Sequence, residues 1–110
     1  MAELLKRGDV TSILRAWAEA TVPSQRERDE FAQLVEWARF YGLRMPVSGE
    51  QVATYLLEMM ADGASLADIK RAANAIAACY AQRRHFLDLV PIRAALKIAA
   101  EQLSPGRTLN

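Results

Sequence analysis

The chain has 110 residues, of which 52% are hydrophobic and 25% are charged, and its formal net charge is +1 at pH 7. This length suffices for one domain with its own core and is too short for two domains of usual size. No apolar stretch approaches the roughly 18 residues of a membrane-spanning helix, and the first residues lack the apolar centre of a signal peptide, so we expect a cytoplasmic protein. The single cysteine, Cys79, excludes an internal disulfide and any zinc site built from several cysteines.

Apolar residues recur at helical spacing in five segments of the chain. The first segment, residues 9–20, ends before Pro23. The second begins after Ser24, a good N-cap residue, and continues to Tyr41, where Gly42 provides a stop.

The third and fourth segments also begin at serines. Ser48 and Gln51 have the spacing of a capping box, in which each side chain bonds the other residue's backbone N–H. Gly63 can end the third helix, and Ser65 can cap a fourth that covers residues 65–84.

The fifth segment begins near Asp88 and includes Pro91, which a first helical turn tolerates. It continues to the Pro105 and Gly106 pair. No segment alternates as a strand would, and no internal repeat is present. The sequence therefore predicts an all-α fold, a compact bundle around one core.

The fourth segment has an unusual outer face. Opposite its apolar stripe, the helical spacing predicts small and polar residues: Ala67, Arg71, Asn74, Ala75, Ala78 and Gln82. A helix with a slim outer face can enter a DNA major groove, which is about 12 Å wide. Alanine is also simply the best helix former, so such a face needs no ligand.

The charges are unevenly distributed along the chain. Residues 1–68 hold seven Lys and Arg against eleven Asp and Glu, whereas residues 69–100 hold six basic residues against one acidic residue. The basic part is a candidate for an anionic partner, although clustered arginines also occur on plain solvated surfaces.

Catalytic constellations are missing from the sequence. The one histidine, His85, follows Arg83 and Arg84 at the end of the fourth segment, where an imidazole complements the helix dipole. The glycines form no phosphate-binding loop. We therefore expect no enzyme, no bound metal, no cofactor and no small-molecule substrate.

Two aromatic residues fit the predicted core poorly. Trp37 lies at the edge of the apolar stripe of the second segment, and Phe40 projects to its side. They are predicted either to receive the first helix or to contact another protein chain.

The order of these segments resembles the N-terminal core-binding domain of tyrosine recombinases, the phage-integrase family. The resemblance covers about residues 9–105. It depends on VEWARFYGL at the end of the second segment, on Val52, Tyr55 and Leu56, on the junction of Gly63 and Ser65, and on the run from Ile69 to Ile76 before a last helix with Pro91.

The resemblance implies a SAM-like orthogonal bundle of four to five helices that clamps one face of a recombination-site duplex. In that family the second and fourth helices enter the major groove, and a separate C-terminal domain carries the catalytic residues. The expected organisation is a tail over 1–8, a core-binding domain over 9–105 and a tail over 106–110. No catalytic residue is carried over to this chain.

The resemblance also implies which residues contact DNA. The groove-facing positions fall on Ser65, Ala67, Asp68, Lys70, Arg71 and Asn74 of the fourth segment, and near Ser24, Gln25 and Arg28 of the second. By their chemistry, Arg71 and Asn74 suit the base edges of guanine and adenine. Phosphate contacts are predicted for Lys70, Arg83, Arg84, Arg93 and Lys97.

The implied partners are double-stranded DNA and neighbouring recombinase protomers on that DNA, and the implied location is the nucleoid of a prokaryote. The alternative is a helical protein-interaction module that uses Trp37, Phe40 and the first helix without binding DNA.

Overall fold

The structure, a computed structural model, describes residues 22–103. Within this range it contains four helices and no strand: α3 (Gln25–Phe40), α4 (Gly49–Ala61), α5 (Leu66–Gln82) and α6 (Leu89–Leu103). The prediction of an all-helical fold is confirmed for this part of the chain. The first predicted helix, residues 9–20, lies outside the described residues, as do the two predicted tails.

Three of the helices begin at the serines that the sequence indicated. Ser24 and Ser48 each accept a hydrogen bond from the backbone N–H three residues later, and the side chain of that later residue accepts one in return. The Ser65 hydroxyl accepts from the Asp68 N–H at 3.1 Å. Because these bonds satisfy donors that a helix leaves unpaired, the serines fix where α3, α4 and α5 start.

The end of α5 lies two residues earlier than predicted. Arg84 adopts a left-handed backbone with φ of 58°, and the N–H of His85 then donates to the Tyr80 carbonyl. Glycine usually occupies such a position, so the sequence contained no stop signal there. Pro91 lies in the first turn of α6, as predicted.

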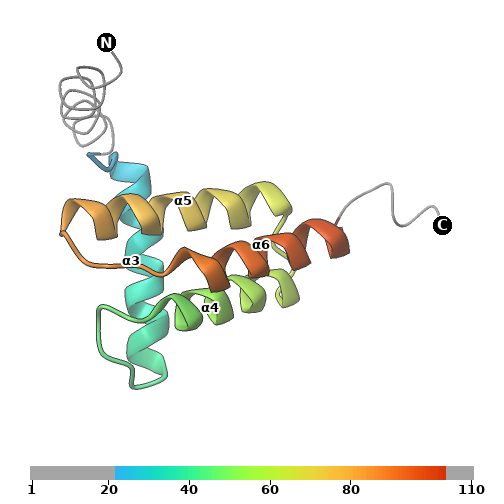
Figure 1. Ribbon diagram of the computed structural model, residues 1–110, viewed down its shortest axis with the longest axis horizontal. Coiled ribbons are helices and arrows are strands. Elements are labelled where there is room, and N and C mark those ends of the chain that lie inside the picture. The colour runs from blue at the N-terminus through green and yellow to red at the C-terminus, as the bar shows by residue number, and fades with distance from the viewer. Residues whose placement is uncertain (1–21, 104–110) are drawn as a thin grey trace, which may run out of the picture.

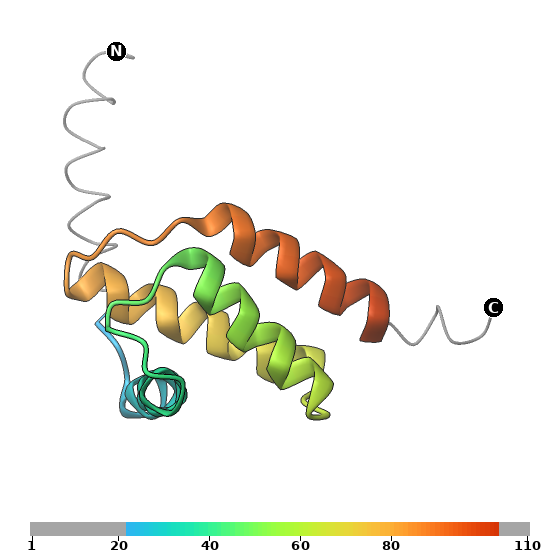
Figure 2. The ribbon, with the colours of Figure 1, turned by 90° about the horizontal axis from the view of Figure 1, so that it is seen from below.

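The helices form three layers. Figure 1 shows α4, α5 and α6 running roughly alongside one another, while α3 crosses behind them at a steep angle and its first turns extend beyond α5. Figure 2 shows α3 and α6 on opposite sides of α4 and α5. The most extensive contacts join α4 to α6 and α3 to α5.

The core lies where these layers meet. Its largest fully buried side chains come from all the elements but α6, namely Tyr80, Leu34, Leu56, Ile69, Ile76, Val47, Val52, Pro23 and Cys79. The hydroxyl of Tyr80 donates a 2.6 Å hydrogen bond to the carbonyl of Val47, so the polar end of this buried ring is satisfied. The packing of α5 against three other helices decides how much of its surface stays exposed.

Candidate nucleic-acid interface

The outer face of α5 is a narrow strip, because α3, α4 and α6 all contact this helix. Lys70 and Asn74 lie on the strip and are exposed, together with Ala67 and Gln82. Ala75 was predicted on this face, but it is fully buried. That prediction assumed a helix covered on one side, whereas a helix packed on three sides also buries the flanks of its apolar stripe.

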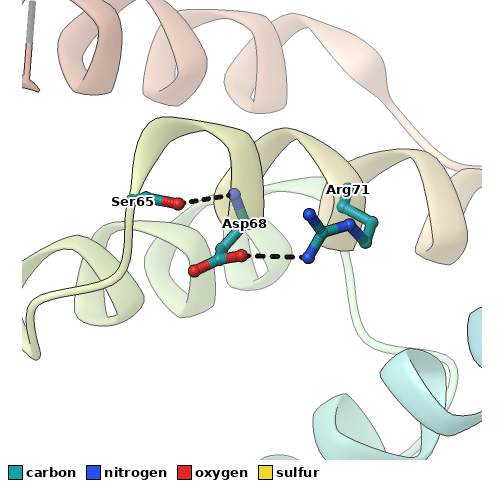
Figure 3. A network of polar contacts seen from close by, with 3 residues as sticks. All are labelled: Ser65, Asp68 and Arg71. Carbon is teal, nitrogen blue, oxygen red and sulfur yellow. Dashed lines mark hydrogen bonds and ion pairs between the residues drawn. The ribbon is translucent and has the colours of Figure 1, made fainter.

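Asp68 and Arg71 form an ion pair at one edge of the strip, next to the cap of α5 (Figure 3). Arg71 Nη1 donates to Asp68 Oδ1 at 2.9 Å. Hydrogen bonding to Ser65 and then to Arg71 lowers the pKa of the Asp68 carboxyl, so this group is ionised at neutral pH. Arg71 is therefore held in place by a charged neighbour, whereas Lys70 forms no ion pair with any residue between 22 and 103.

The predicted residues at the start of α3 are bound to one another and to the local backbone. Gln25 Nε2 donates to Asp29 at 2.8 Å, and Arg28 donates to the carbonyl of Pro23 and to Gln25 at 2.9 and 3.0 Å. Ser24 is used as the cap of α3. These contacts fix the first turn of α3, and Ser24 is explained as its cap, as Ser65 is explained as the cap of α5.

The start of α3 meets the end of α5. The guanidinium of Arg83 lies 4.7 Å from the centre of the Phe31 ring, which is a cation–π contact between the two helices. Burial raises the pKa of the Cys79 thiol, Arg83 opposes this rise, and the charges of Glu27 and Arg28 act in opposite directions. Arg83 thus lies against α3, on the ring of Phe31. Arg84, the residue after Arg83, is exposed.

The two predicted basic residues of α6 lie outside this group. Arg93 and Lys97 are exposed and one turn apart. Their helix and α3 lie on opposite sides of α4 and α5 (Figure 2). The structure therefore leaves the predicted basic residues of α6 in a layer separate from the predicted residues of α3.

Aromatic and aliphatic side chains are exposed at other places. Phe40 is 81% exposed and Phe86 is 87% exposed. Trp37, in contrast, packs edge-on against Tyr41 and Tyr55 with ring centres 5.3 and 5.4 Å away. Phe40 is thus the better candidate of the two predicted contact residues. Sequence reasoning missed Phe86, because a connection between helices has no apolar periodicity that could mark it.

Other kinds of site are poorly represented in the described residues. A half-open hollow of about 260 Å³ lies between α3 and the end of α5, with mostly apolar walls. Residues 22–103 contain no group of three side chains that could hold a metal ion. In the same range, no helix is both long and apolar enough to cross a membrane.

Comparison of the chain with models of protein families, with curated proteins and with solved structures gives no match. The candidate interface is therefore supported only by the geometry and charge of α3 and α5.

Proposed function

We propose that this chain is a DNA-binding module of the core-binding type found in tyrosine recombinases, and that α5 and the start of α3 contact a duplex. The observation that carries the proposal is the outer strip of α5. Three helices cover the rest of α5, and the strip that remains combines small residues with Lys70 and Asn74. Such a strip fits the width of a major groove and offers groups that bond phosphates and base edges.

The arrangement of α3 adds to this support. Its first turns extend beyond α5, so they can flank a duplex that lies on the strip (Figure 1). The basic residues of this part are Arg28, in the first turn of α3, and Arg83, which packs on the Phe31 ring. Phosphate contacts of this kind position a protein on DNA and supply most of its non-specific affinity.

The distribution of charge along the chain also supports α5 as the surface that binds DNA. Residues 66–103 hold six basic residues against three acidic residues, whereas residues 22–62 hold four against seven. The outer face of α3 carries Asp29 and Glu36, which border a shallow surface hollow. These acids, and Glu27 in the first turn of α3, repel phosphates, so Arg28 is the residue of α3 that is expected to approach the duplex.

The proposal is tested by titrating the 110-residue chain into labelled duplex DNA at low and at physiological salt, with fluorescence anisotropy as the readout. Binding should weaken steeply as salt rises, and Lys70→Ala/Arg71→Ala should reduce it by about tenfold or more at low salt. Arg39→Ala/Arg44→Ala is the matched control, because it removes the same charge from the last turn of α3 and the loop that follows it. Equal losses in both double variants, or no binding at low salt, would contradict the assignment.

A protein-interaction module is the second candidate, and the exposure of Phe40 and Phe86 favours it. Large apolar groups in water mark contact sites when they gather in a patch. This function predicts a mass that rises with protein concentration in the absence of DNA, as measured by sedimentation equilibrium. Phe40→Ser should then restore a monomer, while a monomer at all concentrations would count against self-association through this residue.

A further inference from the structure

The Asp68 and Arg71 pair faces away from the body of the protein. Figure 3 shows both side chains on the side of α5 opposite α4, with α6 and α3 to either side. The side chains are 50% and 38% exposed, respectively. The pair therefore lies at the edge of the strip that is proposed to meet DNA, where a groove could reach it.

Asp68 lies in the first turn of α5, where a negative charge stabilises the helix. A carboxylate near phosphates weakens their attraction to the protein, so Asp68 does not favour a contact with the DNA backbone. Base edges are different, because the exocyclic amine of cytosine is a hydrogen-bond donor and a carboxylate accepts from it. Asp68 thus fits a base edge better than it fits a phosphate.

Arg71 has the complementary chemistry. One N–H of its guanidinium is bonded to Asp68, and a guanidinium has five N–H donors in a rigid fork. The remaining donors include pairs that can bond guanine O6 and N7 together. Because Asp68 holds one end of the fork, Arg71 would lose less side-chain freedom on meeting a base.

We infer that Asp68 and Arg71 together read one G·C base pair, Arg71 by two bonds to guanine and Asp68 by orienting Arg71 and accepting from cytosine. This inference rests on the proposed DNA-binding function and adds to it a preferred base pair at one position. The neighbouring Lys70 carries a point charge, so it would contact a phosphate and contribute no preference for a base pair.

The test begins with selection of bound duplexes from a pool with a randomised central segment, using the 110-residue chain at low salt. Affinities for a selected duplex, and for the same duplex with each G·C pair replaced by A·T, are then measured by anisotropy. The original chain should prefer G·C at one position by about fivefold to a hundredfold. Asp68→Asn should reduce this preference while raising the affinity for mixed-sequence DNA.

Two further variants separate base reading from a structural role. Arg71→Lys keeps the charge but loses the fork, so it should retain non-specific binding and lose the preference. Glu50→Gln removes a carboxylate from the first turn of α4 and should leave the preference unchanged. Circular dichroism establishes that each variant is helical.

Each outcome decides between the claims. Binding without a preferred G·C position, or a preference that Asp68→Asn and Arg71→Lys leave intact, overturns the reading by this pair and leaves the DNA-binding function standing. Absence of binding to any duplex overturns that function and this inference with it.

Discussion

Gly49 lies against Asp88, the residue before α6, and its replacement by alanine should loosen that contact. The residue is buried at the first position of α4. A Cβ added there would fall inside the contact distance of the Asp88 carbonyl oxygen, and it would lie 3.1 Å from the carbonyl carbon and 3.2 Å from the Asp88 Cβ. These atoms belong mostly to backbone, so no flexible side chain can move aside.

The size of the effect follows from two opposing contributions. Overpacking of a well-filled site costs typically about 1–3 kcal/mol. Alanine has a better helix propensity than glycine, which offsets at most about 1 kcal/mol. The upper end of the overpacking cost applies, because the added Cβ would meet the backbone of Asp88, so we expect a net loss of about 2 kcal/mol, or a fall in Tm of roughly 8–16 °C for a domain of this size.

Urea denaturation followed by circular dichroism measures this loss. Gly63→Ala is the control, because a Cβ at Gly63 meets no atom within 4 Å and its φ of 97° costs only backbone strain, about 1–2 kcal/mol. Stability of Gly49→Ala within about 0.5 kcal/mol of the original chain would show that α4 and α6 are not as close as the structure has them.

Three other predictions concern the core and the interface. Tyr80→Phe removes the bond to Val47 and should cost about 1–2 kcal/mol in urea denaturation. Burial raises the pKa of Tyr80 to about 12, above its value of 10.0 when unfolded, so stability should hold below pH 10, fall as the pH rises toward 12, and fall less in Tyr80→Phe; an equal fall in both chains would refute this. Asp29→Asn should raise the affinity for duplex DNA severalfold in anisotropy at low salt, and an unchanged affinity would place the duplex away from α3. Phe31→Leu keeps an apolar core residue but removes the ring under Arg83, so it should weaken DNA binding where Phe31→Tyr does not.

Local signals predicted most of the fold. The caps at Ser24, Ser48 and Ser65 depend on a few neighbouring residues, and so the starts of three helices could be found from the sequence. The end of α5 could not, because Arg84 occupies a left-handed position that is usually glycine.

The sequence indicated several residues of the candidate site, but it did not indicate how the helices around them pack. Helical spacing placed Arg71 and Asn74 on the outer face of α5, and the family resemblance added Lys70; in the structure Lys70 and Asn74 are exposed and Arg71 is partly exposed. The same spacing placed Ala75 outside, because a single-helix pattern does not show how many neighbours the helix has. The contact of Arg83 with Phe31 joins residues far apart in sequence and has no local signal.

Under the proposed function, burial of Ala75 and the pairing of Arg71 both reduce the surface that is available to DNA. Packing on three sides restricts α5 to a strip on which few side chains can reach a duplex, so each of them matters more. One of the two cations near its start, Arg71, is held by Asp68, while Lys70 forms no ion pair within residues 22–103. The proposed function therefore assigns the non-specific attraction of DNA to Lys70 and Arg83, and it assigns the recognition of sequence to Arg71 with Asp68.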